Sequence, residues 1–418
     1  MWDSKDSRRK FLKTSAAATV PLFLPSGVLA ASGRAGANGR VGVGIVGMGT
    51  RGGQLAETMP ADGRIVAACD ADFGLAAKQR ERLGGDWDVE RDYRRMLDRA
   101  DIDAVVVCPC DHHHVLAAML ACQAGKDVYV EKPISLTIAE GRALVNAARR
   151  YGRVAQTGTQ QRTMELNRFA CEYVRDGKIG EVKVVEALNF NTPVADPGHP
   201  SEAVPDGLDW DLWLGPAADR SYNAAYRKGF MKWRDFGGAG MTGLGSHAFD
   251  MVQYALGTDD TGPVEIWPVG DGPRARLRYR YANGVEVRLE DRGPRLGAIF
   301  VGSDCKMEIN RNKFTTNPPD FVTGAPDPAV AVPWDGPGWK AKGHVQNWLD
   351  CVRSREKPNA DIEIGHRSAT ICHLLNICRE LGRPLRWDPD REVFPGDAEA
   401  NAKLDRPRRK GWELPEIG

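Results

Sequence analysis

The chain has 418 residues, which is too long for one ordinary hydrophobic core and predicts at least two domains. Its 57 basic and 56 acidic residues leave a formal charge of +1, which excludes the polybasic surface typical of nucleic-acid-binding proteins. The nine cysteines include no C-x-x-C pair, so we expect buried free thiols rather than a disulfide framework.

The N-terminal stretch predicts an export signal. Residues 7–13 contain the twin arginines Arg8 and Arg9, and an apolar stretch follows at 14–28. It is too short and too interrupted by prolines for a membrane-spanning helix, so we expect no stable membrane insertion. Twin-arginine signals direct folded proteins across a membrane. We therefore assign residues 1–35 to a signal peptide and linker and expect the twin-arginine export machinery as a partner and a periplasmic or otherwise exported location.

The sequence VGVGIVGMGTRGG at residues 41–53 predicts a buried parallel strand, a glycine-rich turn and the start of a helix. Its glycines have the spacing G-x-G-x-x-G. Gly47 suits a tight turn, Gly49 lets the backbone approach a pyrophosphate, and Gly52 lets helix and strand pack closely. The phosphates would lie over the helix N-terminus. The alternative is a glycine-rich turn without a ligand.

A second predicted strand, residues 64–69, ends at Asp70. A carboxylate about twenty residues after such glycines holds the 2′-hydroxyl of an adenosine ribose and repels a 2′-phosphate. Strand, glycines, helix and acid in this order predict a dinucleotide site that prefers NAD to NADP.

Helices and strands continue to alternate up to residue 160. The predicted helices are 71–83, 115–123 and 136–149, and the predicted strands are 101–108, 126–130 and 153–157. This alternation predicts the α/β class, with a doubly wound parallel Rossmann sheet over residues 36–160. Ligands bind at the carboxyl ends of such strands. The polar loops 108–114 and 131–133 are therefore expected to border the cofactor.

The loop CPCDHHH at residues 108–114 also holds residue types that bind metals. Adjacent histidines at a helix start point in different directions, however, and no distant group of ligands completes a site. We expect this loop to line the cofactor cleft and expect no metal.

Lys132, in the sequence Glu131-Lys132-Pro133, ends a predicted strand and faces the cleft. Burial and the positive charge of an oxidised nicotinamide both lower the pKa of a lysine. Such a lysine can hold a substrate hydroxyl and assist its deprotonation. The alternative is a solvated lysine beside Glu131.

From residue 161 onward the pattern changes to a predicted α+β domain over 161–385. The predicted elements are helices 162–176, 344–355 and 365–381 and strands 181–190, 264–269, 274–281, 285–289, 298–301 and 306–309. Arginines alternate with apolar residues along 274–281, which predicts a large, mainly antiparallel sheet with one wet or partner-facing side. We expect a long loop at 311–338 and a tail at 386–418 that wraps the surface.

The turn at Asn283-Gly284 joins two of these strands. A two-residue turn would mix the apolar and charged faces, whereas a three-residue loop from Ala282 to Gly284 pairs Tyr279 with Val287. Because the buried face sets the register, we predict the longer loop, with Gly284 at positive φ.

Two further features of this domain could contact a substrate. Five aromatic residues lie in one connection, of which we expect two to touch ligand and the rest to be core: Trp210, Trp213, Tyr222, Tyr226 and Trp233. A glycine-dense stretch, 236–245, leads into His247 and Asp250, which share one face of a helix start. A histidine there can remove a proton from a sugar hydroxyl, although a structural role fits equally well.

Taken in order, these motifs resemble those of the Gfo/Idh/MocA oxidoreductases, which include glucose-fructose oxidoreductase and inositol dehydrogenase and join a dinucleotide domain to an open-faced sheet domain. The resemblance spans nearly the whole chain after the signal. The motifs that carry it are Gly47-x-Gly49-x-x-Gly52, 108–114, Glu131-Lys132-Pro133, 157–162, Trp233-Arg234, the glycines before His247, 365–370 and 385–389.

The resemblance implies that Lys132 orients the reacting hydroxyl and that His247 is the acid/base, with Tyr226 and Asp250 as further substrate contacts. It also implies a homo-oligomer through the C-terminal sheet. The expected NAD-binding residues are Gly47, Met48, Gly49, Thr50, Arg51, Gly52, Asp70, Cys108, Pro109, His112, His114, Glu131, Lys132, Gln160, Trp233 and Arg234.

One position departs from the family pattern. The family places an acid four residues before the histidine, where this chain has Gly243. Asp250, Asp235 or Tyr226 could orient His247 instead, and the sequence does not choose among them.

Three functions fit these observations. The first is NAD-dependent oxidation or reduction of a sugar-like hydroxyl, with a tightly held cofactor because no soluble NAD pool exists outside the cytoplasm. The second is a redox-neutral, NAD-dependent glycoside hydrolase or lyase that uses transient oxidation. The third is a non-catalytic carbohydrate-binding protein that retains a nucleotide site.

Overall fold

The structure, a computed structural model, describes residues 39–327, 340 and 342–417. The predicted export signal and most of the second half of the loop predicted at 311–338 lie outside the described residues. The first sheet has six parallel strands in the order β3-β2-β1-β4-β5-β6. Its elements are β1 (Val41–Val46), α2 (Thr50–Glu57), β2 (Gly63–Cys69), α3 (Phe73–Leu83), β3 (Asp88–Glu90), α4 (Tyr93–Leu97), β4 (Ala104–Val107), η2 (Asp111–His113), α5 (His114–Gln123), β5 (Asp127–Val130), α6 (Ile138–Arg150) and β6 (Ala155–Thr157).

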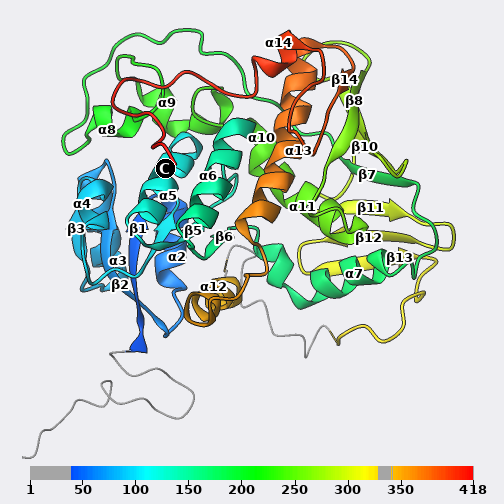
Figure 1. Cartoon of the computed structure of the whole chain (residues 1–418), viewed down its shortest axis with the longest axis horizontal. Helices are drawn as coiled ribbons and strands as arrows, with labels where there is room; N and C mark the ends of the chain where they lie inside the picture. Colours follow the sequence, from blue (N-terminus) through cyan, green and yellow to red (C-terminus); the bar gives the residue numbers. More distant parts are fainter. Residues whose placement is uncertain (1–38, 328–339, 341, 418) are drawn as a thin grey trace, which may run out of the picture. The chain divides into compact units, whose positions relative to one another are not determined.

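The second sheet has eight mostly antiparallel strands in the order β13-β12-β11-β7-β10-β9-β8-β14, with β7 and β10 parallel (Figure 1). The remaining elements are η3 (Gln160–Thr163), α7 (Glu165–Arg175), β7 (Val184–Leu188), α8 (Trp210–Leu214), α9 (Ala224–Lys228), η4 (Phe230–Lys232), α10 (Ala239–Gly243), α11 (Gly245–Leu256), β8 (Pro263–Val269), β9 (Arg276–Tyr281), β10 (Glu286–Glu290), β11 (Ala298–Val301), β12 (Lys306–Asn310), β13 (Lys313–Asn317), α12 (Lys342–Ser354), α13 (Ile362–Leu381), β14 (Leu385–Arg386) and α14 (Ala398–Asn401). Both sheets agree with the predicted fold class.

Local signals set the ends of the helices that carry the site. The Asp72 side chain caps α3 by accepting a hydrogen bond from the Leu75 N–H, and Gly84 ends the helix at φ +60°. Helix α11 ends in the same way at Gly257, with φ +66°. These boundaries fix Asp70 just before α3 and His247 in the first turn of α11.

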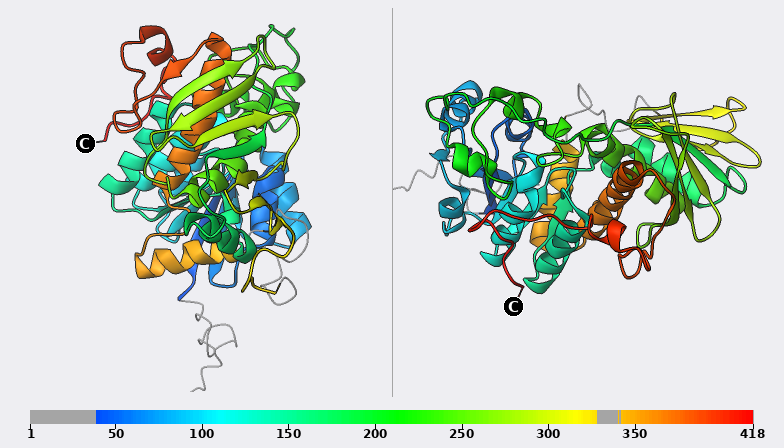
Figure 2. Two further views of the ribbon diagram at one scale, coloured as in Figure 1. Left: turned by 90° about the vertical axis from the view of Figure 1, so that its right-hand side faces the viewer. Right: turned by 90° about the horizontal axis from the view of Figure 1, so that it is seen from above.

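The register of the second sheet follows its buried face. Tyr279 pairs with Val287, and Arg280 pairs with Glu286. Gly284 donates its N–H to the Tyr281 carbonyl and has φ +90°. The predicted three-residue loop is therefore confirmed. Along β9 the apolar side chains are buried, and the arginines that alternate with them are more exposed. Helices pack along one face of this sheet (Figure 2).

Three sequence predictions were wrong or incomplete. The segments that form β3 and α4 were not predicted because each is very short. Strand β13 lies inside the predicted loop, where its polar, half-exposed edge sequence KFTTN gives no alternating signal. Helix α10 forms within the predicted glycine loop, although glycine disfavours helix.

The core of the first sheet also uses residues from later in the chain. Trp348 of α12 is fully buried and packs edge to face on Tyr129 of β5, with ring centroids 5.7 Å apart. Trp412 of the C-terminal tail belongs to another cluster of this core. All nine cysteines lie in the described part of the chain as free thiols. Among the described helices, none combines the length and apolar character needed to cross a bilayer.

Candidate active site

The glycine turn after β1 has the geometry of a phosphate cradle. Gly47 adopts φ +90°, and a Cβ there would lie 2.5 Å from the Pro109 nitrogen. A Cβ on Gly52 would lie 1.9 Å from the Gly47 carbonyl oxygen, so helix and turn touch through backbone. Gly49 has nothing within 4 Å of that position. The turn thus leaves open space at the start of α2, where an anionic group meets backbone N–H groups.

Asp70 lies at the carboxyl end of β2 beside this turn. Its Oδ2 accepts a hydrogen bond of 2.7 Å from the Met48 N–H, and its Oδ1 accepts one of 2.8 Å from the Asp72 N–H. Burial raises the pKa of Asp70 despite these bonds. Each carboxylate oxygen can accept a further bond, which fits a ribose hydroxyl.

A cavity of about 380 Å³ joins these groups. Its wall includes many expected NAD-binding residues, namely Gly47, Gly49, Thr50, Arg51, Asp70, Cys108 and Pro109. The second domain closes it with Leu212, Trp213, Arg227 and Phe230. The open cradle, the half-buried carboxylate of Asp70 and the cavity together fit a dinucleotide. Of the five aromatic residues from which two were expected to touch ligand, Trp213 borders this cavity. The ring of Trp210 stacks on the ring of Trp213, with ring centroids 4.7 Å apart.

The histidines after β4 bind backbone carbonyl groups. The Nε2 atoms of His112 and His113 lie 3.0 and 2.9 Å from the Trp213 carbonyl oxygen, and His114 Nδ1 lies 2.6 Å from that of Pro133. His113, which the sequence did not single out, borders the cavity, whereas His112 and His114 do not. Within the described ranges no group of three or more His, Cys, Asp or Glu residues could hold a metal ion.

Glu131 and Lys132 follow β5 at the same edge of the sheet. Glu131 forms an ion pair of 2.6 Å with Arg51 of the glycine turn. Burial alone would raise the pKa of Glu131, but the Arg51 guanidinium holds it below its usual value. The half-buried Lys132 donates a hydrogen bond of 2.9 Å from Nζ to the Gly243 carbonyl oxygen. Burial lowers the pKa of Lys132, against the charges of Glu131 and Asp111.

His247 lies within electrostatic reach of Lys132. Its side chain is buried, and its Nδ1 has no hydrogen-bond partner among the described residues. Burial, followed by the positive charges of Lys132 and Arg311, lowers the pKa of His247 well below its ordinary value. The ring is therefore neutral at pH 7 and can accept a proton.

The position of the family's acid is occupied by a methionine side chain. A Cβ on Gly243 would lie 2.4 Å from Cε of Met231, so the Met231 methyl group fills the space where an acid would begin. The Gly243 carbonyl oxygen, rather than a carboxylate, accepts the bond from Lys132.

Each of the three proposed substitutes has a polar partner other than His247. Asp250 is fully buried in an ion pair of 2.9 Å with Arg162, so its carboxylate is already bound within the protein. Asp235 pairs with Arg220. The Tyr226 hydroxyl donates to Asp196 at 2.8 Å, and its ring is buried in the aromatic cluster. Its substrate contact stays a prediction.

The structure instead brings Asp111 to Lys132. Asp111 is buried, its Oδ2 has no hydrogen-bond partner in the described part of the chain, and its charge acts on Lys132. Burial raises the pKa of Asp111 to about 6. The sequence analysis missed this residue, although its place directly after β4 was a usable signal.

Seven other expected NAD-binding residues lie outside the wall of this cavity: Met48, Gly52, Glu131, Lys132, Gln160, Trp233 and Arg234. Gln160 is buried in η3, and its Oε1 has no partner among the described residues. Trp233 donates from Nε1 to the Ala225 carbonyl at 3.2 Å. Arg234 forms an ion pair with Glu380 and borders a different cavity.

Comparisons with known proteins agree with this architecture. The sequence model described as "Oxidoreductase family, NAD-binding Rossmann fold" matches residues 41–159, and "Oxidoreductase family, C-terminal alpha/beta domain" matches residues 192–414. Inositol 2-dehydrogenase 2 of Saccharopolyspora erythraea is 30% identical over 356 residues, covering 79% of this chain and 90% of that protein.

Two other relatives match over shorter stretches. A 2,7-anhydro-N-acetylneuraminate hydratase of Mediterraneibacter gnavus is 32% identical over 144 residues, covering 34% of this chain and 37% of the relative. Levoglucosan dehydrogenase of Pseudarthrobacter phenanthrenivorans is 26% identical over 189 residues, covering 45% of this chain and 41% of the relative. The chain thus matches less than half the length of either protein.

Among solved structures, levoglucosan dehydrogenase in complex with NADH and levoglucosan has a TM-score of 0.62 at 18% identity, covering 83% of this chain and 99% of that one. Aldose-aldose oxidoreductase from Caulobacter crescentus, complexed with glycerol, has a TM-score of 0.60 at 18% identity and covers the same shares. At this identity the likeness shows a shared fold.

Proposed function

The chain belongs to the Gfo/Idh/MocA oxidoreductase family, and on that premise we propose that it is an NAD-dependent enzyme that oxidises or reduces a hydroxyl of a sugar-like substrate. The observation that carries this proposal is the convergence of Lys132 and His247 at the carboxyl edge of the Rossmann sheet. The dehydrogenase relatives support a polyol or sugar as the substrate class.

The two side chains divide the acid–base work. Bound NAD supplies a hydride acceptor or donor for a substrate carbon. Lys132, whose pKa is lowered by burial, holds the reacting hydroxyl oxygen and stabilises negative charge that develops on it. His247 is neutral and accepts the hydroxyl proton at a ring nitrogen, or returns it in the reverse direction. Asp111 beside Lys132 supports the ammonium charge in place of the missing acid at Gly243.

We further propose that the cofactor is held through many turnovers. Residues 207–233, here named the strap, supply one wall of the nucleotide cavity. Two interactions bind the strap to the residues just before α3. The Asp209 N–H donates a hydrogen bond of 2.9 Å to the Ala71 carbonyl oxygen, and Arg227 forms an ion pair of 2.8 Å with Asp72. Arg409 of the C-terminal tail donates hydrogen bonds to the Gly215 and Asp211 carbonyl groups of the strap. Exchange of NAD requires these contacts to open together.

Export supports the same proposal. A protein that carries a twin-arginine signal at Arg8 and Arg9 folds in the cytoplasm, where NAD is available. Outside it, a cofactor that dissociated after each turnover could not be replaced. Each cycle must then return the hydride, either to a second substrate or to the same sugar.

The test is to purify mature protein from the periplasm and measure bound NAD after denaturation. We expect near-stoichiometric NAD, with release over minutes or longer, which corresponds to a barrier of roughly 20 kcal/mol or more. Protein that purifies empty and needs added NAD in every assay would contradict the retained cofactor. Protein found only in the cytoplasm would contradict export.

One comparison favours a second candidate, a redox-neutral reaction. The 32% identical relative is a hydratase, so the family includes a member whose name denotes no net oxidation. Incubation with glycosides and free sugars without added NAD separates the candidates. A stoichiometric change in nicotinamide absorbance supports the oxidoreductase, and release of free sugar supports a hydrolase or lyase. If neither the absorbance change nor sugar release is seen but sugar still binds, the result supports a carbohydrate-binding protein.

The exposed side of the second sheet is the surface we propose for homo-oligomer formation. Here Arg276 and Arg280 pair with Glu290 and Glu286, and the arginine side chains are 46% and 41% exposed. Light scattering with charge-reversed Arg276→Glu tests this surface, because a shared interface would weaken while a monomer would be unaffected.

A further inference from the structure

A second cavity, of about 670 Å³, lies apart from the nucleotide cavity. Its wall combines the start of α6, residues 192–195, the stretch before α10, the β8–β9 connection, the C-terminal half of α13 and residues 403–406. Neither Lys132 nor His247 borders it. Its volume is in the range of small-molecule sites.

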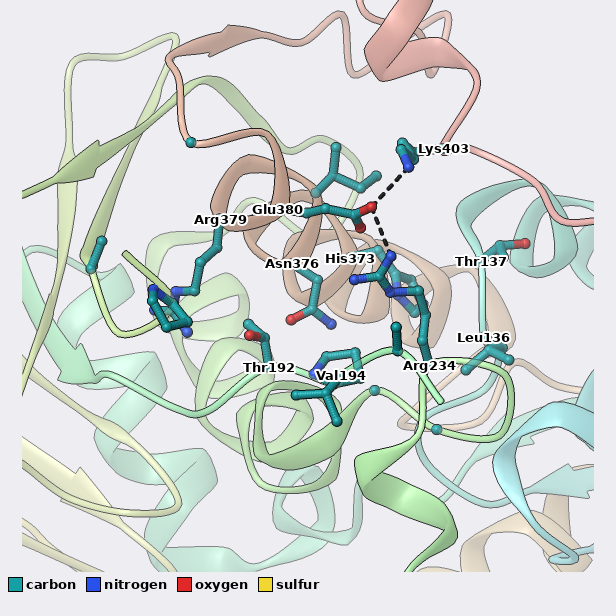
Figure 3. A pocket seen from close by; sticks show the side chains of 18 of the residues that line it. Leu136, Thr137, Thr192, Val194, Arg234, His373, Asn376, Arg379, Glu380 and Lys403 are labelled. Carbon is teal, nitrogen blue, oxygen red and sulfur yellow. Dashed lines mark hydrogen bonds and ion pairs between the residues drawn. The ribbon is translucent and has the colours of Figure 1, made fainter. Parts of the chain in front are cut away.

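One face of α13 supplies a row of polar groups to this cavity. His373, Asn376 and Glu380 follow one another at spacings of three and four residues, so they share this face. Figure 3 shows Asn376 directed into the cavity between Arg379 and Arg234. The Asn376 Oδ1 and His373 Nε2 atoms are buried and have no hydrogen-bond partner among the described residues.

Arg379 is a buried cation without a carboxylate partner in the part of the chain that the structure describes. Its side chain is 7% exposed, and it donates to two neutral acceptors, the Phe190 carbonyl at 2.6 Å and Asn189 Oδ1 at 2.5 Å. Its Nε is buried with no partner in the same range. Burial without a counter-charge lowers the pKa of Arg379 to about 10. An isolated buried charge is costly unless an ion pairs with it.

The other cations of the wall already have carboxylate partners. Arg234 and Lys403 each form an ion pair of 2.8 Å with Glu380, as the dashed lines in Figure 3 show. Arg406 forms one of 2.8 Å with Glu140. Arg379 is therefore the cation of this wall that has no carboxylate partner among the described residues, whereas Arg234 and Lys403 share one carboxylate and the rest of the wall offers neutral hydrogen-bonding groups.

We propose that this cavity binds a small hydroxylated monocarboxylate of the sugar-acid class. Its carboxylate pairs with Arg379, and its hydroxyl groups bond to Asn376, to neutral His373 and to Thr192, which also borders the cavity. Burial keeps His373 neutral by lowering its pKa to about 4, so the imidazole offers a hydrogen bond without a second charge. A single cation suits a carboxylate better than a doubly charged phosphate.

The experiment is calorimetric titration of the full-length holoprotein with gluconate, with glucose and acetate as matched probes lacking the charge and the hydroxyls. We expect gluconate to bind at millimolar concentration or below, and each matched probe at least about ten-fold more weakly. Failure of gluconate to bind, or equal binding of acetate or glucose, would overturn the proposal.

Variants locate the binding. Arg379→Met should weaken gluconate about ten-fold or more, whereas Arg386→Met, at an exposed arginine outside this wall, should leave it unchanged. Asn376→Ala provides a second test that removes no hydrogen bond within the described chain, and it should weaken gluconate several-fold. Lys132→Ala should leave it intact. Binding that survives Arg379→Met and Asn376→Ala, or that disappears in Lys132→Ala, would assign gluconate to the redox site and refute a separate one.

Discussion

Replacing Arg409 with methionine tests whether the strap controls release of the cofactor. Arg409 lies outside the nucleotide cavity, so its loss cannot remove a direct contact with NAD. Its side chain donates to the Gly215 carbonyl at 3.0 Å and the Asp211 carbonyl at 2.7 Å, and it also pairs with the Asp211 carboxylate. All three bonds end on the strap.

The size of the effect follows from these bonds. The Arg409 side chain is 16% exposed, whereas Asp211 is 71% exposed, so the carboxylate bond contributes little. The two bonds to carbonyl groups contribute about 1 to 1.5 kcal/mol each. If release requires the strap to open, Arg409→Met lowers the barrier by about 2 to 3 kcal/mol and speeds release about 30- to 150-fold.

The assay follows NADH fluorescence after holoprotein is mixed with an NADH-consuming trap enzyme. Arg355→Met is the matched control, because Arg355 also binds two carbonyl groups, of Val352 and Gly152, and a carboxylate, that of Asp127. Arg355 does not border the nucleotide cavity. We expect release at the wild-type rate in this control. A wild-type rate in Arg409→Met, or equal acceleration in both variants, would show that the strap is not what retains the cofactor.

The remaining predictions concern the cofactor, the chemistry and the pH dependence of stability. Protein refolded without cofactor should bind NADP at least about ten-fold more weakly than NAD in calorimetry, because Asp70 repels a 2′-phosphate; equal affinity would remove this role from Asp70. Lys132→Ala and His247→Ala should each lower turnover by about two to four orders of magnitude while NAD binding survives, and near-wild-type turnover would remove that residue from the mechanism. Denaturant titrations should show the free energy of unfolding falling as pH drops from 6.5 to 4. Six of the eight histidines have lowered pKa values in the native state, so they bind protons more readily in the unfolded chain: His112, His113, His247, His344, His366 and His373. Three carboxyl groups have raised pKa values in the native state and therefore oppose this effect: Asp70, Asp111 and Asp250. A flat profile over this range would contradict the assignment of neutral buried histidines.

Features that depend on neighbouring residues were predictable from the sequence. The strand before Gly47 and the open position at Gly49 follow from side-chain size and spacing. The pairing of Tyr279 with Val287 follows from alternation, because one face of the sheet must be buried. The same reasoning failed at β13, where an edge strand buries too little to leave a pattern.

Features that depend on distant contacts were not predictable in this way. Met231 and Gly243 are twelve residues apart, and only the folded chain brings the methyl group to the position of the missing acid. Asp250 and Tyr226 fit a substrate role by spacing, but buried partners elsewhere in the chain, Arg162 and Asp196, occupy them. A local sequence pattern does not predict such partners, because the charge of a residue does not determine which distant residue of opposite charge will bind it.

The contact between Arg409 and the strap also orders events during biosynthesis. Translation proceeds from the N-terminus, so the glycine turn at residues 47–52 emerges long before the residue that fastens the strap from outside. On the ribosome the nucleotide site is therefore accessible until Arg409 has been made. A chain truncated before Arg409 would then fold around its nucleotide without the hydrogen bonds that Arg409 donates to the strap.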